Sequence, residues 1–195
     1  NCTGTSQSFT ITVNPSGQVN DPSDQVVCNG NTTVAVNFNT NNTGGSTTYS
    51  WTNDNPSIGL GASGTGDIAA FTAVNTGTSP EVATITVTPT FSNGGEACTG
   101  SSQNLTITVN PSAQVNDPSD QVVCNDSPTV AVNFTTNNTG GTTTYSWTND
   151  NTTIGLAASG TGDIAAFTAV NTGTSPEVAT ITVTPTYSNG GENCT

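Results

Sequence analysis

The chain repeats itself at a spacing of 96 residues. Residues 1–99 and residues 97–195 are identical at 84 of the 99 aligned positions. The differences are mild: Phe9 corresponds to Leu105 and Phe91 to Tyr187, so apolar bulk is kept. A period of this length exceeds the roughly 20–50 residues of solenoid repeats and matches the size of a small β-sandwich domain. The repeat therefore predicts a tandem array of whole domains.

Two Asn-Pro dipeptides indicate where the domains meet. They lie at 14–15 and 110–111, each after the strand-like sequence TITV and before the identical stretch QVNDPSDQVVCN. We therefore expect one complete domain over residues 15–110. Residues 1–14 would be the last strand of a preceding or neighbouring-subunit domain, and residues 111–195 a second domain that lacks its last strand.

Two explanations stay open for the extra strand at the start of the chain and the missing strand of the second domain. The chain is a window from a longer array, or it is a fibre subunit that polymerises by donating residues 5–13 (TSQSFTITV) to the next copy. The tripeptide NCT stands at both ends. A donated strand would thus bring Cys2 to the position that Cys194 already holds, which favours the window.

Apolar and polar residues alternate in every strand-like segment. In EVATITVTPTF (81–91), Ala83, Ile85, Val87 and Phe91 share one face and threonines share the other. Threonine suits a pleated surface because it is β-branched. The further candidates are TVAVNF (33–38), TYSWTN (48–53), LTITVN (105–110) and, more weakly, QVVC (25–28) and DIAAFTAV (67–74). Gly- and Asn-rich turns separate them. We expect about seven strands per domain in an all-β, immunoglobulin-like sandwich, with Trp51 and Trp147 in the core.

The charge composition excludes several functions. The chain has 13 acidic residues and no Lys, Arg or His, for a net charge of −13. Such a protein cannot neutralise phosphates, so we expect no nucleic-acid partner, and an anionic membrane surface should repel it. A Ser or Cys nucleophile would lack a His or Lys base. The composition therefore predicts a non-enzymatic protein without a cofactor, with no insertion into a membrane.

The five cysteines predict a disulfide framework. Two pairings respect the repeat: Cys28–Cys98 with Cys124–Cys194, or Cys2–Cys28 with Cys98–Cys124. Cys98 precedes the last strand of one domain, and that strand must cross to the far pole before Cys124 begins the next domain. A disulfide needs Cα atoms within about 7 Å. We therefore predict Cys28–Cys98 and Cys124–Cys194, with Cys2 paired outside the chain.

Two ligand hypotheses come from side chains near the junctions and on the third strand. The sequence NDPSD places Asp21 and Asp24, repeated as Asp117 and Asp120, where oxygen ligands could bind Ca²⁺; an Asp-Pro turn with solvated carboxylates is the alternative. Trp51 and Trp147 could instead form a sugar-binding platform, although core packing is favoured. Several Asn-X-Ser/Thr sequons occur, as expected by chance in an Asn- and Thr-rich chain.

The combined motifs resemble a known family. VVCNG, TYSWTNDNPSIGL, ASGTGDIAAFTA, ATITVTPT, CTG and FTITVNP together resemble the PKD-like, immunoglobulin-like repeats of very large Bacteroidetes surface proteins, including gliding-motility adhesins. The resemblance implies an extracellular, cell-surface location. It also implies a structural stalk or filament repeat whose partners are near-identical domains in a linear array. The alternatives are an adhesin module that binds a glycan or a surface, and the strand-donating fibre subunit described above.

Overall fold

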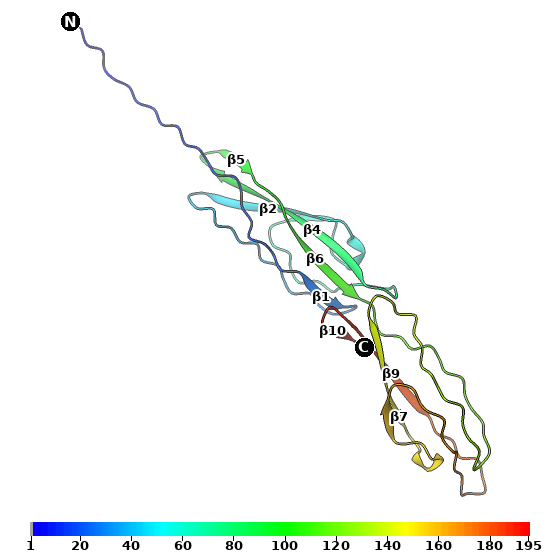
Figure 1. Ribbon diagram of the computed structural model, residues 1–195. Coiled ribbons are helices and arrows are strands. Elements are labelled where there is room, and N and C mark those ends of the chain that lie inside the picture. The colour runs from blue at the N-terminus through cyan, green and yellow to red at the C-terminus, as the bar shows by residue number, and fades with distance from the viewer. Residues whose placement is uncertain (1) are drawn as a thin grey trace.

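The computed structural model describes residues 2–195 as an elongated rod (Figure 1). Residues 2–14 form an extended, exposed segment at one end. Two β units follow one another along the rod: the strands of the first unit lie within residues 25–110 and those of the second unit within residues 142–194. Strands dominate, and the helical elements are the single 3₁₀ turns η1 (Pro56–Ile58) and η2 (Thr152–Ile154). The expected all-β class is confirmed.

The first unit is built on one sheet with the order β1-β6-β4-β2-β3. Its strands are β1 (Gln25–Cys28), β2 (Ser46–Asn53), β3 (Ser63–Thr65), β4 (Glu81–Asn93), β5 (Glu96–Thr99) and β6 (Gln103–Asn110). β4 is long enough to pair with β6 along one part of its edge and with β5 along the rest. β1 pairs with β6 in parallel, and the other pairings are antiparallel. The parallel pair places the last residue of β1 beside the last residue of β6.

The period-two pattern of β4 creates the core of the first unit. Ala83, Ile85 and Val87 are fully buried, while the alternating threonines lie on the other face. Leu105, Ile107 and Val109 of β6 are equally buried beside them. At roughly 25 cal/mol per Å² of apolar surface, these side chains contribute much of the stabilisation of the unit.

The second layer of the sandwich is extended chain with little ladder pairing. The expected strand at 33–38 is reduced to an isolated bridge between Val36 and Ile68. Side chains take over the missing backbone bonds: the Gln25 amide donates to the Val34 carbonyl and accepts from the Val34 N–H, both at 2.9 Å. The Asp67 carboxylate accepts from the Phe38 N–H at 2.8 Å. Because these backbone groups are satisfied, the segment stays extended without belonging to a sheet.

The second unit repeats this plan but leaves one edge open. Its sheet has the order β10-β9-β7-β8, formed by β7 (Thr142–Asn149), β8 (Ser159–Thr161), β9 (Ile181–Asn189) and β10 (Glu192–Cys194). No counterpart of β6 exists within residues 111–195. Residues 121–124 repeat the sequence of β1 but form no strand, and residues 177–180 do not extend β9 as residues 81–84 extend β4. β6 therefore organises strands on both of its sides.

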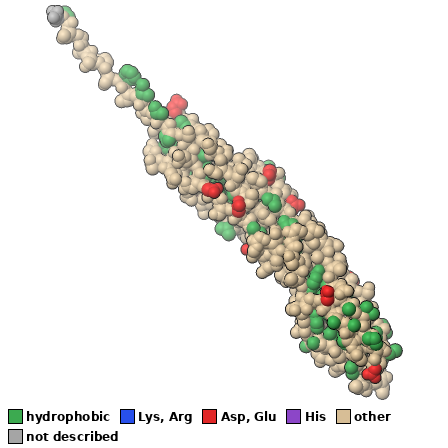
Figure 2. All heavy atoms as spheres, in the orientation of Figure 1, with side chains coloured by type: hydrophobic (Ala, Val, Ile, Leu, Met, Phe, Trp, Pro, Cys, Tyr) green, Lys and Arg blue, Asp and Glu red, His purple; other side chains and the backbone are tan. Residues whose placement is uncertain are grey.

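The surface carries isolated carboxylates along the whole rod (Figure 2). The extended N-terminal segment is different, because its apolar side chains face solvent: Phe9, Ile11 and Val13 are 86%, 79% and 87% exposed. The apolar face of this extended segment therefore packs against no other part of the described chain.

Candidate functional site: the junction between the units

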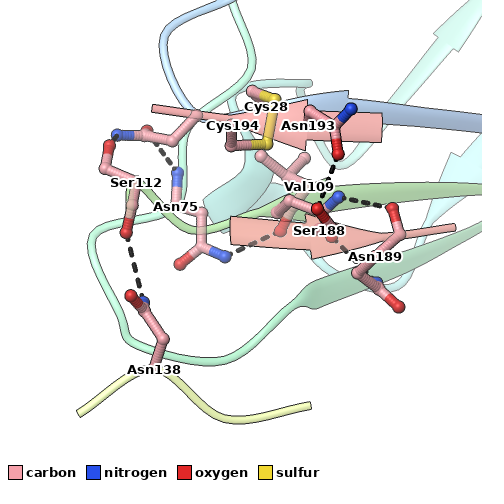
Figure 3. Close-up of a disulfide and its surroundings, with 11 residues drawn as sticks. Cys28, Asn75, Val109, Ser112, Asn138, Ser188, Asn189, Asn193 and Cys194 are labelled. Carbon is pink, nitrogen blue, oxygen red and sulfur yellow. Dashed lines mark hydrogen bonds between the residues drawn. A yellow bond between two sulfur atoms is a disulfide. The ribbon is translucent and has the colours of Figure 1, made fainter. Parts of the chain in front are cut away.

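A disulfide joins the two units. Cys28 ends β1 of the first unit, and Cys194 ends β10 of the second (Figure 3). Their Cα atoms are 5.5 Å apart, and 166 positions separate them in the sequence. Both side chains are buried, together with Tyr187. In the chain-entropy view, closing a loop of this length stabilises the folded chain by about 5 kcal/mol.

The hairpin between β9 and β10 brings Cys194 back to the first unit. Its turn residues Gly190 and Gly191 have φ of +60° and +84°, the left-handed region that favours glycine. A Cβ atom on Gly190 would lie 3.0 Å from Val26, so the turn packs closely against β1. The β9–β10 hairpin of the second unit therefore packs against β1 at the end of the first unit.

Reciprocal amide bonds flank the disulfide. Asn110, at the end of β6, donates to the Asn189 carbonyl at 3.0 Å, and the Asn189 side chain donates back to the Asn110 Oδ1 at 2.9 Å. The Asn29 N–H donates to the Asn110 carbonyl at 2.8 Å. Asn110 is fully buried. These bonds satisfy its polar groups, which would otherwise be costly to bury.

A second set of bonds crosses the junction beside Ser112. Across the junction, the Asn29 side chain donates to the Ser112 hydroxyl at 3.1 Å. The Asn138 side chain donates to the Ser112 carbonyl of its own unit at 3.1 Å (Figure 3) and to the Thr78 carbonyl of the first unit at 3.4 Å. The Thr139 N–H donates across to the Thr78 carbonyl at 2.9 Å. Bonds at separated points resist bending in more than one direction.

Tyr187 anchors the second unit at this junction. Its hydroxyl donates to the Thr139 carbonyl at 2.9 Å, and its ring is fully buried. Burial raises the pKa of the Tyr187 phenol above its usual value, so the neutral, hydrogen-bonding form is favoured. The counterpart in the first unit is Phe91, which has no hydroxyl. The exchange of Phe91 for Tyr187 keeps apolar bulk, but the sequence does not reveal the partner of the added hydroxyl.

The structure corrects the predicted disulfides. Cys28 pairs with Cys194 and not with Cys98, and the thiols of Cys98, Cys124 and Cys2 are free. The prediction placed Cys28 and Cys98 at the same pole of the domain. Because β1 runs parallel to β6, Cys28 lies opposite Asn110 at the far pole. Cys98 lies at the near pole, where its carbonyl accepts from the Gly17 N–H at 3.0 Å.

Asp24, one of the four aspartates predicted to bind calcium, lies beside β6 and not at the junction. Asp24 accepts a 2.7 Å hydrogen bond from the Thr106 N–H, midway along β6. Within the part of the chain that the structure describes, no three acidic, Cys or His side chains group together in a way that could hold a metal ion. Calcium binding by Asp21, Asp24, Asp117 and Asp120 stays a prediction, which thermal unfolding with and without a chelator tests.

The Asp24 bond leads to a matched pair of expectations. Asp24→Ala should destabilise the first unit by about 1–2 kcal/mol, because a hydrogen bond to an ionised acceptor is lost from the β6 backbone. Asp120→Ala should leave stability unchanged, since no counterpart of Thr106 exists within residues 111–195. Urea unfolding of both variants measures the difference, and equal losses would contradict it.

The tryptophans pack inside the units. Trp51 and Trp147 are 8% and 7% exposed. Each ring lies over a glycine of the neighbouring strand, Gly64 or Gly160, where a Cβ atom would collide with it. The ring that would form a sugar platform is thus covered by the protein itself, as core packing requires.

The comparisons with known proteins agree with this architecture. A family model described as a PKD-like domain matches residues 25–113. No curated protein matches the chain. PKD-like, immunoglobulin-like domains are generally non-catalytic. Among residues 2–195, no helix is long and apolar enough to cross a membrane. A buried disulfide persists in oxidising compartments, which fits an extracellular structural module. Residues 25–113 are therefore similar to a PKD-like domain.

Proposed function

We propose that the chain is a load-bearing segment of an extracellular stalk or filament that projects from a cell surface. The observation that carries this proposal is the Cys28–Cys194 disulfide, which ties one unit to the next. A disulfide within each unit would strengthen the units and leave the hinge between them free. A disulfide between the units stiffens the hinge, which is what a projecting rod requires.

The surroundings of the disulfide support the same function. Further contacts link the two units around the disulfide. They are the packing of the β9–β10 hairpin, the Asn110–Asn189 amide pair and the Thr139–Thr78 backbone bond. Relative motion of neighbouring domains is the usual expectation where an interface is small and polar. Here a covalent bond and several buried polar bonds oppose that motion. Binding of a glycan or a surface by the loops, as in an adhesin, stays a prediction.

Small-angle scattering of the chain tests the proposal. The oxidised chain should scatter as a stiff rod with one narrow distribution of end-to-end distances. Cys28→Ser should broaden this distribution, because the junction then depends on polar bonds alone. Cys124→Ser is the matched control, since it removes a thiol from the same QVVC sequence without touching the disulfide. A broad distribution for the oxidised parent chain would contradict a stalk role.

A further inference from the structure

In the second unit, the apolar side chains that correspond to those covered by β6 in the first unit are exposed, and this uncovered apolar surface is called the groove below. Val122 is 99% exposed and Val123 is 40% exposed, whereas Val27, the counterpart of Val123, is 8% exposed. Ala83, Ile85 and Val87 are fully buried, but their counterparts in the second unit are only partly buried. The affected residues are Val122, Val123, Ile154, Ala179, Ile181 and Val183. The two units have nearly the same sequence, so the exposure comes from the missing strand.

The N-terminal segment has the sequence that this groove requires. Residues 7–14 read QSFTITVN, and β6 reads QNLTITVN. Phe9, Ile11 and Val13 are exposed, whereas their counterparts in β6 are 0–1% exposed. One end of the rod thus carries an unpaired strand, and the other unit carries an empty place for the same strand. The segment extends away from that groove (Figure 1), so the chain does not fill its own groove.

Where the N-terminal segment joins the first unit, its hydrogen bonds match those at the junction between the two units. The Asn14 side chain donates to the Asn93 carbonyl at 2.8 Å, and the Asn93 side chain donates to the Asn14 Oδ1 at 3.0 Å. This pair reproduces the Asn110–Asn189 pair, 96 positions further along. A unit placed around residues 7–14 would therefore meet the first unit as the first unit meets the second.

We propose that the groove of the second unit binds residues 7–14 of a second copy of this chain. The inference rests on the proposed end-to-end array and names its partner. The pairing follows from the register of β6: the donated strand runs parallel to residues 121–124 and antiparallel to residues 177–183. Ile11 lies opposite Ala179, and Val13 lies opposite Val123. The N–H of the donated Thr10 then meets the Asp120 carboxylate, as Thr106 meets Asp24.

Strand addition of this kind gains backbone hydrogen bonds along both neighbours and buries alternate side chains. Residues 2 and 3 of the donor copy stay outside the groove, because Cys194 and Thr195 of the acceptor already hold the corresponding positions. Each copy has a net charge of −13, so the copies repel one another at low salt. Near physiological ionic strength the screening length is about 8 Å, and short-range strand pairing then prevails.

The same arrangement assigns a partner to two free thiols. Cys28 of one unit bonds to Cys194 of the next. In the assembled array, the first unit of the donor copy follows the second unit of the acceptor copy. The equivalent cysteines at that junction are Cys124 of the acceptor and Cys98 of the donor, which would lie side by side. Oxidised glutathione, a small disulfide, can join them by thiol–disulfide exchange. The two protein thiols give up two protons and two electrons and form one S–S bond, and the reagent is reduced to two glutathione thiols.

The test uses the full chain carrying Cys2→Ser, to remove the third thiol, at physiological salt with a glutathione redox buffer. Non-reducing gels should show a ladder of multimers. Peptide mapping of the multimer bands should recover Cys98 joined to Cys124. Adding Ile11→Asp should lower the cross-linked fraction by more than about tenfold, because an unpaired carboxylate is not tolerated in the apolar groove. Since Ile11 is exposed, the monomer should unfold at an unchanged temperature.

Ser8→Asp is the control with the same charge. Its counterpart Asn104 is exposed, so this carboxylate stays in solvent and the ladder should persist. A chain that remains monomeric, or cross-links that are indifferent to Ile11→Asp, would overturn the inference. These outcomes are separate from the scattering experiment above: a stiff monomeric rod defeats strand donation and leaves the stalk role standing.

Discussion

Reduction of the Cys28–Cys194 disulfide should lengthen the chain under load by roughly 550–600 Å. The 166 positions between the two cysteines can each extend by about 3.3–3.6 Å when the chain is stretched. While the disulfide is intact, force applied at the two ends passes from residue 28 to residue 194 through the sulfur atoms. Of the two units, only residues 15–28 and the last residues from Cys194 onward then lie on the loaded path, so the chain between the bridged cysteines cannot be pulled open.

Single-molecule force spectroscopy with handles at the two ends measures this length. The oxidised chain should show at most the release of residues 15–28, and only the reduced chain should show the unfolding steps of the rest of both units. Cys28→Ser should behave as the reduced chain without any reductant. Cys124→Ser should behave as the oxidised parent. Equal contour lengths before and after reduction would show that the disulfide does not carry the load.

The second large effect concerns one strand sequence in two environments. Ile107→Ala should destabilise the first unit by about 2–5 kcal/mol, because it leaves a cavity in a packed core. Ile11→Ala changes the same residue of the same TITV sequence. Ile107 is fully buried and Ile11 is 79% exposed, so Ile11→Ala should change the stability of the monomer by less than about 0.5 kcal/mol.

Urea unfolding of the monomer, followed by tryptophan fluorescence, separates the two cases. A Trp147→Phe background leaves Trp51 as the reporter of the first unit. Similar losses for Ile11→Ala and Ile107→Ala would mean that residues 7–14 are packed in the isolated chain. The comparison matters for assembly. Ile11 gains no burial free energy in the monomer, and docking into a second copy would supply it.

The fold class was predictable because its signal is local. Alternation in residues 81–91 and 105–110 specifies which side chains enter the core, and these segments became β4 and β6. The segment at 33–38 shows the limit of that signal. Its residues alternate in the same way, yet the Gln25 and Asp67 side chains bind its backbone in place of a neighbouring strand. Such side-chain bonds depend on the tertiary arrangement and leave no periodic trace.

The disulfide was not predictable by the same reasoning, because it depends on strand direction. Nothing in QVVC shows that β1 pairs in parallel with β6, and this direction alone carries Cys28 to the far pole. The equal spacing of the cysteines in both repeats is compatible with bridges within units and between them. The side-chain pair of Asn110 and Asn189 was likewise hidden, since the second asparagine lies in an ordinary Asn-Gly-Gly turn.

A bridge between residues 28 and 194 also affects how the chain tolerates damage. Exposed loops are the usual sites of cleavage by proteases, and the connections of both units run over the surface. A single cut anywhere between the bridged cysteines leaves the two fragments joined through sulfur. The molecule would then lose a peptide bond without being severed, and the proposed stalk would keep its continuity after such a cut.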